Sequence, residues 1–371
     1  MSHVALLIPT LDRIGGAERQ VLLLAQALAA RNWRVTLIAL SGSASLPPHI
    51  PETTGIAYLS LNMRKAWIDP AGWSRYLHWH RANHPDVLHA HLPHATWFAR
   101  CVRLFAPVPV LVDTIHTSAT GGMLRRLAYR ATDLLTTRVT CVSQTVAETI
   151  FAHRMASPAH LSVVHNGVVL SAPPDPINQS TSGIFRWIAI GRLAPVKDYP
   201  TLLRAFADLP PHAQLTILGT GPDEDTMRYQ ALTLGIAARI HFAGFIADIQ
   251  PFLAQADAFV LASLWEGLPV SILEAQAASL PVVATNAAGT RETMLDGCTG
   301  HIVPVGDSTA LAAAMARIMN MFPADRAAMG ARGRQLVLEQ FEIGIIAETW
   351  DRLYRTLLES HPRRKQSVLS S

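Results

Sequence analysis

Short apolar runs rich in Val, Ile and Leu alternate with longer segments of helical periodicity along most of the 371-residue chain. Strands that are apolar throughout are typical of parallel sheets buried on both faces, with helices as the outer layers. The sequence therefore predicts an α/β fold with doubly wound sheets. The expected strands lie at 3–9, 34–40, 56–61, 86–91, 110–116, 138–143, 185–191, 214–219, 239–245, 258–263, 282–285 and 301–305.

The alternation is interrupted by residues 169–183, which contain three prolines and show no periodicity. We therefore predict two Rossmann-like domains facing across a cleft, at 1–168 and 184–344, joined by a linker at 169–183. Residues 345–371 are expected to form a helix that packs back on the first domain, followed by a basic tail. Ligands of doubly wound sheets bind beyond the carboxyl ends of the strands, so functional residues are expected just after strands.

The composition excludes several classes of protein. The chain has 50% hydrophobic and 16% charged residues, and its longest apolar stretch, 21–30, is too short to span a bilayer. The three cysteines are widely spaced, which argues against a disulfide framework or a zinc site. No secretory signal is visible, so a cytoplasmic location is expected. The net charge of +4 includes basic groups around 125–138 and at 363–365, and neither shows the interleaving with aromatic residues that is used to stack bases, which argues against nucleic acid as a partner.

The segment after the strand at 258–263 is the most informative. Glu266 lies in a loop and Glu274 follows eight residues later on the next helix, so both carboxylates are able to face one pocket. The N–H groups of Gly267, Leu268 and Val270, at the helix N-terminus, favour phosphate or sugar hydroxyls there. Two glutamates on a solvated helix face would give the same spacing. The adjoining G-L-P turn, with Pro269 expected at the first helical position, and the P-V-V-A-T strand make the pattern more specific.

This segment resembles the E-x7-E motif of retaining glycosyltransferases of family 4, the glycosyl transferase group 1 enzymes, which have the GT-B fold. The resemblance extends over nearly the whole chain. It implies that Glu274 binds the ribose hydroxyls of a nucleotide-sugar and that Glu266 lies against the donor sugar. Carboxylate oxygens suit this role because they accept hydrogen bonds from the two ribose hydroxyls.

The resemblance also assigns residues to the donor diphosphate and the base. Arg192 and Lys197, in a G-R-L-x3-K arrangement, are implied to hold the diphosphate, whose growing charge needs fixed cations or a metal. No Asp-x-Asp is placed to carry a metal, and the only such pair, Asp223 and Asp225, is expected to cap a helix. We therefore expect neither a metal nor a cofactor. The remaining implied donor-binding residues are the glycine turn at Gly219 and Gly221, and Phe245 and Ile246 near the base.

In the first domain the resemblance implies two further functional positions. Gly15 and Gly16 follow the first strand and would let a backbone approach the donor phosphate or the acceptor closely. His116 ends the fifth strand and is implied to lie near the donor sugar, although a core histidine is the ordinary alternative for an isolated His. His89 and His91 share one face of a strand, but no nearby Asp, Glu or Cys completes a metal site.

Together these residues predict a retaining glycosyltransferase that moves a hexose from a nucleotide diphosphate sugar to a glycan or lipid-linked acceptor. A UDP-sugar is favoured, with a GDP-sugar as the alternative. The first domain would bind the acceptor and the second the donor. The other functions considered are a nucleotide-sugar epimerase and a non-catalytic nucleotide-sugar-binding protein on the same fold; the intact set of polar residues argues against the latter.

Two segments of the first domain have the composition of a surface that contacts anionic membrane. Residues 123–130 combine basic and apolar side chains, and residues 65–79 contain Trp67, Trp73 and Trp79. These tryptophans are either helix core or membrane-facing, and the sequence does not separate the two readings. The resemblance to enzymes that build lipid-linked glycans predicts peripheral contact with the inner face of the plasma membrane.

Overall fold

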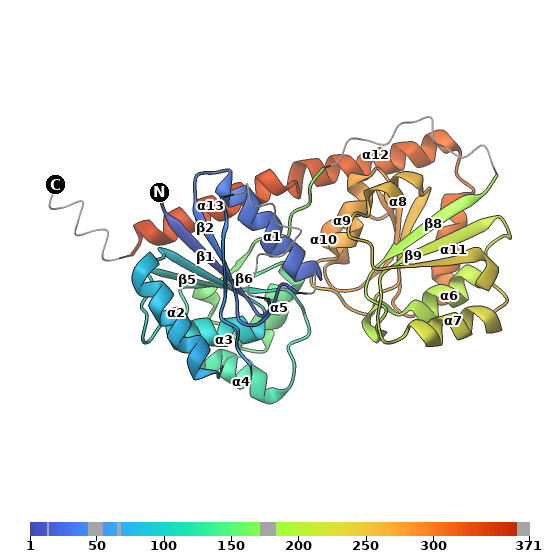
Figure 1. The fold of residues 1–371 in the computed structure, drawn as a ribbon. Helices are drawn as coiled ribbons and strands as arrows, with labels where there is room; N and C mark the ends of the chain where they lie inside the picture. The colour runs from blue at the N-terminus through green and yellow to red at the C-terminus, as the bar shows by residue number, and fades with distance from the viewer. Residues whose placement is uncertain (13–14, 44–54, 65–67, 171–182, 362–371) are drawn as a thin grey trace. The chain divides into compact units, whose positions relative to one another are not determined.

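A computed structural model describes residues 1–12, 15–43, 55–64, 68–170 and 183–361. The chain divides into two compact units, one made of Met1–Gly167 with Ile343–Ser371 and the other of Val168–Glu342. Each unit contains a parallel sheet with helices packed against both of its faces (Figure 1). The predicted pair of doubly wound α/β domains is therefore confirmed.

The first unit has a seven-stranded sheet in the order β3-β2-β1-β4-β5-β6-β7. Its strands are β1 His3–Ile8, β2 Arg34–Ala39, β3 Ala57–Ser60, β4 Val87–His91, β5 Val110–Ile115, β6 Arg138–Cys141 and β7 Leu161–Val163. Strand β7 was not predicted, because its three half-buried residues leave no apolar run to detect. The other strands begin and end within two residues of their predicted bounds.

Alternate side chains of this sheet pack on opposite helical layers. Val4, Leu6 and Ile8 of β1 face a cluster that includes α1 (Gly16–Ala29) and α13 (Ile343–Glu359). Ala5 and Leu7 face the cluster of α2 (Pro70–Asn83) and α3 (Pro93–Val102). This follows from the two-residue period of a strand. Two further helices, α4 (Met123–Thr132) and α5 (Gln144–Ala152), complete the unit.

The last helix belongs to the first unit. It buries Trp350, Tyr354 and Leu357 against the core of that unit. Two long-range hydrogen bonds hold it there: Arg31 Nη2 donates to the carbonyl of Gly344 at 2.7 Å, and Trp33 Nε1 donates to Asp351 Oδ1 at 2.6 Å. A helix that begins directly after the second unit ends therefore completes the hydrophobic core of the first.

The second unit has a six-stranded sheet in the order β10-β9-β8-β11-β12-β13. Its strands are β8 Phe185–Ile190, β9 Ala213–Leu218, β10 Ile240–Gly244, β11 Ala258–Leu261, β12 Val282–Thr285 and β13 Gly300–Val303. Trp187 and Ala189 of β8 face one layer of helices, and Ile188 faces the other. The helices are α6 Tyr199–Ala207, α7 Glu224–Thr233, α8 Gln250–Gln255, α9 Val270–Ala277, α10 Thr290–Thr293, α11 Ser308–Met319 and α12 Pro323–Gln340.

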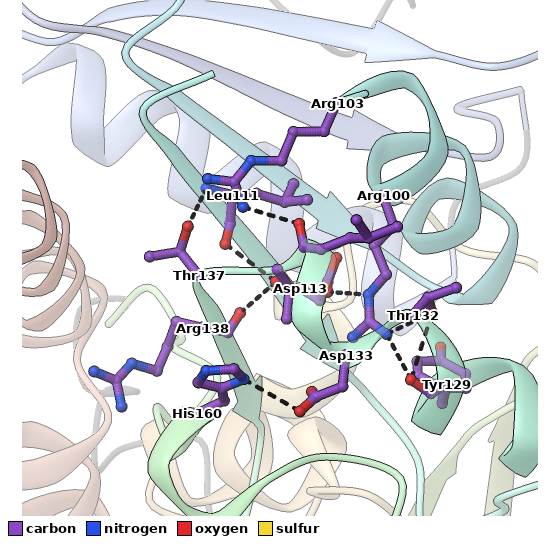
Figure 2. A network of polar contacts seen from close by, with 12 residues as sticks. Arg100, Arg103, Leu111, Asp113, Tyr129, Thr132, Asp133, Thr137, Arg138 and His160 are labelled. Atoms are coloured by element: carbon purple, nitrogen blue, oxygen red, sulfur yellow. Dashed lines mark hydrogen bonds and ion pairs between the residues drawn. The ribbon is translucent and has the colours of Figure 1, made fainter. Parts of the chain in front are cut away.

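A buried ionic network fixes α4 to the sheet of the first unit (Figure 2). Arg100 of α3 and Asp113 of β5 are fully buried, and Arg100 Nε donates to Asp113 Oδ2 at 2.7 Å. Arg100 Nη1 also donates to the carbonyl of Tyr129 and to Thr132 Oγ1, both at 2.9 Å. Since a buried charge is costly unless it is paired, this network specifies where the C-terminal end of α4 lies.

Candidate functional site

The predicted donor-site residues of the second unit gather at the carboxyl ends of β8, β9 and β11. After β8 the chain turns through Gly191 and Arg192 into the short 3-10 helix Pro195–Lys197. The loop after β11 returns to the same place, where the N–H of Leu264 donates to the carbonyl of Val196 at 2.8 Å. Loops from two neighbouring strands are thus joined by their backbones, which sets the positions of the charged side chains that they carry.

An ammonium group and a carboxylate meet at this point. Lys197 Nζ lies 2.5 Å from Glu266 Oε1, and Ser263 Oγ donates to the same oxygen at 2.6 Å. Both charged side chains are largely buried, with 16% of Lys197 and 14% of Glu266 exposed. The pair therefore joins Lys197, which was predicted to hold the diphosphate, to Glu266, which was predicted to lie against the donor sugar.

Two glycines make close packing of the neighbouring loops possible. Gly219 has φ +141°, and a Cβ built there would lie 2.0 Å from the carbonyl oxygen of Gly191. A Cβ at Gly221 would lie 2.0 Å from the carbonyl oxygen of Leu193. The N–H of Leu193 also donates to the carbonyl of Thr220 at 3.0 Å. The glycine turn was expected beneath a nucleotide; in the structure it lies directly against the loop that carries Arg192.

Two supporting residues escaped the sequence analysis. Tyr199 Oη donates to the carbonyl of Gly191 at 3.0 Å, and burial together with the nearby Glu266 carboxylate raises the pKa of its hydroxyl. Ser263 is fully buried, and its carbonyl accepts a hydrogen bond from Thr285 Oγ1 at 2.6 Å. The position of Ser263 just after β11 was a usable signal, whereas nothing in the sequence distinguishes Tyr199 from a core tyrosine.

The other predicted donor-site residues differ in exposure. Arg192 is exposed, and Phe245, just after β10, is 61% exposed. Glu274 is half-buried on α9, in the second turn of that helix. The remaining positions lie nearby in the chain: Gly267 and Leu268 are buried just before α9, Val270 opens that helix and Ile246 is half-buried after β10.

Of two expectations about helix ends, the one for Pro269 is wrong and the one for Asp223 is confirmed only in its position. Pro269 was placed at the first helical position, but it occupies the N-cap of α9, and Val270 is the first helical residue. Asp223 was expected to cap a helix through its side chain. It does occupy the N-cap of α7, but its side chain makes no capping hydrogen bond, while its N–H donates to the carbonyl of Leu193 at 3.1 Å. The backbone of Asp223 thus supports the glycine turn.

In the first unit the paired glycines open α1. Gly15 is the N-cap of this helix, and its N–H donates to Glu18 Oε2 at 3.0 Å. A Cβ at Gly16 would meet no atom of the described residues within 4 Å. The preceding residues Arg13 and Ile14 lie outside the described part of the chain.

His116 lies one residue beyond β5, at the carboxyl end of the first sheet. Its Nε2 is 3.0 Å from Nδ1 of His91, the last residue of β4. Desolvation lowers the pKa of His116 to about 4, so its imidazole is neutral at pH 7. No group of three or more His, Cys, Asp or Glu side chains suited to a metal ion occurs among the described residues.

The tryptophans of α2 that the structure describes contribute to the core. The Trp73 ring packs edge-on against Phe98 with 5.4 Å between centroids, and Trp79 packs against Tyr76 at 5.8 Å. The interpretation that these tryptophans are part of the helix core is therefore confirmed for Trp73 and Trp79. Trp67 lies outside the described residues, as do the basic residues of the tail after residue 361. No described helix combines the length and the apolar character that a bilayer span requires.

Comparison with known proteins follows the same two-unit division. Residues 14–172 match the model of Glycosyltransferase Family 4, and residues 179–336 match that of Glycosyl transferases group 1. The lipopolysaccharide core biosynthesis glycosyltransferase LpsE of Rhizobium meliloti is 30% identical over 364 residues, which cover 94% of this chain and 97% of LpsE. The chain belongs to the family 4 (group 1) glycosyltransferases.

Solved structures place this glycosyltransferase in the GT-B fold. Sucrose-phosphate synthase from Thermosynechococcus elongatus aligns with a TM-score of 0.85 at 22% identity, covering 97% of this chain and all of the other. Anabaena HepE, solved in complex with UDP and glucose, aligns with a TM-score of 0.81 at 19% identity, covering 95% of this chain and 99% of HepE. At these identities the likeness establishes the fold, which confirms the GT-B prediction.

Proposed function

We propose that this glycosyltransferase moves a hexose from a nucleotide diphosphate sugar to a glycan or lipid-linked acceptor, with retention at the anomeric carbon and without a metal ion. The proposal is carried by the Lys197–Glu266 pair at the carboxyl ends of β8 and β11. A cation and a carboxylate at the end of a doubly wound sheet suit a ligand with both phosphate and hydroxyl groups.

We assign complementary roles to the residues of the second unit. Lys197 and Arg192 neutralise the diphosphate, the charge of which grows as the sugar leaves. Glu266 accepts hydrogen bonds from the donor sugar and Glu274 accepts them from the ribose. The backbone of residues 267–270 contacts phosphate or sugar oxygens at the start of α9, and Phe245 and Ile246 lie beside the base.

The reaction is a same-face displacement. The bond between the anomeric carbon and the diphosphate oxygen breaks, and a bond from the acceptor oxygen to that carbon forms. The acceptor proton passes to the departing phosphate oxygen, so a nucleoside diphosphate is the second product. We assign His116 to orienting the substrates, since its neutral imidazole has one donor and one acceptor nitrogen.

The donor is proposed to be a UDP-sugar. HepE, which has the same fold, was solved with UDP and glucose, and one relative, 28% identical over 255 residues, is an Escherichia coli galactosyltransferase that uses UDP-Gal. The acceptor class is supported by LpsE, whose name places it in lipopolysaccharide core biosynthesis. A GDP-sugar is the alternative outcome of the test.

Calorimetric titration with UDP- and GDP-sugars, followed by analysis of the anomeric product, tests this proposal. We expect Glu274→Ala to weaken donor binding and His116→Ala to suppress turnover. The matched control is Glu339→Ala, which removes a carboxylate from α12, outside the proposed site. Activity that persists after treatment with EDTA is expected. Full activity in both site variants, or a product of inverted configuration, would remove the assignment.

We also propose that α4 contacts anionic membrane. Met123, Leu124 and Leu127 are 52–83% exposed on this helix, which also carries Arg125, Arg126 and Arg130. Apolar side chains beside basic ones favour the interface of an anionic bilayer. Flotation with vesicles of anionic lipid should recover the protein at low salt, and Leu124→Glu should abolish recovery. The control Leu232→Glu replaces an exposed leucine of the second unit. Equal binding by both variants would contradict the proposal.

A further inference from the structure

Three histidines from β4 and β5 are arranged in series at the carboxyl end of the first sheet. The rings of His89 and His91 lie 4.0 Å apart between centroids, and His91 Nδ1 is 3.0 Å from His116 Nε2. His89 and His91 are both buried. Within the described part of the chain, His91 is the only side chain that hydrogen-bonds to His116. The imidazole of His116 is therefore held at one nitrogen.

The polar contacts around His89 have one consistent direction. Thr140 Oγ1 donates to the carbonyl of Asp113 at 3.2 Å and therefore accepts from Thr114 Oγ1, at 2.6 Å. Thr114 in turn accepts from His89 Nε2, also at 2.6 Å. Since a neutral imidazole has one donor and one acceptor, His89 Nδ1 accepts from Tyr354 Oη at 2.6 Å. Every donor in this chain then has an acceptor, and the proton of His89 is on Nε2.

The tautomer of His91 follows from its unpaired nitrogen. His91 Nε2 is buried and makes no hydrogen bond among the described residues. If Nε2 held the proton, a donor would be buried without an acceptor. If Nδ1 holds it, Nε2 is a buried acceptor without a donor. A buried acceptor without a donor is more common in proteins than a buried donor without an acceptor. His91 therefore donates from Nδ1 to His116 Nε2, which places the proton of His116 on Nδ1.

We propose that His91 is a positioning residue, which fixes the ring and the Nδ1–H tautomer of His116 so that His116 presents a donor, rather than an acceptor, at its free nitrogen. This inference rests on the role of His116 under the proposed function. Burial is the main cause that holds the pKa values of His89 and His91 well below the usual range, and repulsion from a charged His116 lowers both further, so both rings stay neutral. His116 Nε2 is able to accept from His91 Nδ1 because the imidazole of His116 is neutral as well.

The C-terminal helix supports this arrangement. Trp350 of α13 packs against His89 with 4.5 Å between ring centroids, and Tyr354 supplies the hydroxyl that His89 accepts. Both aromatic side chains are buried. Helix α13 therefore restrains the His89 ring, which stacks on His91, and His91 in turn contacts His116.

The tautomer is tested by NMR of protein labelled with ¹⁵N-histidine, with the His116 signals assigned by their loss in His116→Gln. We expect the Nδ1–H tautomer in the wild type and in His91→Asn, whose amide offers a donor in place of Nδ1. We expect a shift toward Nε2–H in His91→Leu. An Nε2–H tautomer in the wild type, or an unchanged pattern in His91→Leu, overturns the proposal.

Kinetics give a second test. His91→Leu should lower kcat by about 10- to 100-fold, as loss of a supporting contact to a functional histidine does elsewhere, with the donor KM within about twofold. His91→Asn should restore most of this loss. Wild-type kcat in His91→Leu, when His116→Ala is inactive, overturns the positioning role. If His116→Ala is itself fully active, the proposed function of His116 fails, and the NMR pattern still decides whether His91 sets its tautomer.

The contribution of α13 has a matched control on the same helix. Tyr354→Phe removes the hydroxyl that pairs with His89 and should lower kcat by about tenfold. Glu348→Ala removes an exposed carboxylate of the same helix that accepts from Arg352, without touching the histidines, and should leave kcat within about twofold. Equal kcat values in the two variants would show that α13 does not act through His89.

Discussion

Gly219 offers a direct test of how the glycine turn shapes the candidate donor site. Its φ is +141°, and a Cβ built there would lie 2.0 Å from the carbonyl oxygen of Gly191, so Gly219→Ala cannot fit without movement of the loop that leads to Arg192. Ordinary contact between a carbon and an oxygen needs more than about 3 Å, so the displacement is about 1 Å. Overpacking costs about 1–3 kcal/mol and the backbone conformation about 1 kcal/mol, which gives a destabilisation of about 2–4 kcal/mol.

The control for this variant is Gly235→Ala. Gly235 also has a left-handed backbone, with φ +69°, but a Cβ there would meet no atom within 4 Å in the part of the chain that the structure describes. This variant should therefore lose only about 1 kcal/mol, from backbone strain. Urea unfolding measures both losses. A loop displaced by about 1 Å should also lower kcat/KM for the donor by about 100-fold in Gly219→Ala and leave it unchanged in Gly235→Ala. Equal stability and activity in the two variants would exclude a steric clash between a side chain at residue 219 and Gly191.

Three further predictions concern charged and titratable groups. Lys197→Met should raise the donor Kd by about 10- to 100-fold, since a charged hydrogen bond contributes about 1.5–3 kcal/mol; an unchanged Kd in calorimetry would exclude Lys197 from the diphosphate site. Because the pKa of His116 is lowered from 6.5 to about 4, the unfolded chain binds more protons between these values, so stability falls as the pH drops through this range. The contribution of His116 should lower the free energy of unfolding, measured in urea, by about 2 kcal/mol at pH 5 relative to pH 8. If His116→Asn lost as much stability over the same pH range, His116 would not be the cause. Arg100→Met leaves Asp113 buried and unpaired and should cost about 3–5 kcal/mol, whereas adding Asp113→Leu should recover most of it; a double variant no more stable than the single one would argue against a buried pair.

Much of the fold could be predicted because buried parallel strands are continuous apolar runs with clear ends. The strand at 282–285 was predicted at its observed bounds, and most others differ by one or two residues at either end. The short strand β7 was missed because its three residues are only half-buried. Helix ends were harder, as Pro269 and Asp223 show, because a residue type that favours a cap does not determine whether its side chain makes the bond.

The candidate site could be predicted only in part. Glu266 and Lys197 stand out in sequence because each follows a strand in a recognisable pattern, but they are 69 residues apart, and their 2.5 Å contact depends on the parallel order of β8 and β11. Ser263 and Tyr199 were missed because the role of a buried hydroxyl depends on which groups it hydrogen-bonds to in the folded protein. The sequence weighed His91 only as a metal ligand, whereas its hydrogen bond to His116 depends on the pairing of β4 with β5.

The α/β class, the two-part division and the side chains available at the strand ends could be predicted, because periodicity and local motifs are properties of neighbouring residues. The tertiary structure then sets which of those side chains meet. It joined Lys197 to Glu266, placed Gly219 against Gly191 and set α13 against the histidine stack of the first unit. These contacts connect residues far apart in the chain, and the physical reason is that strand order and packing, rather than local sequence, fix such distances.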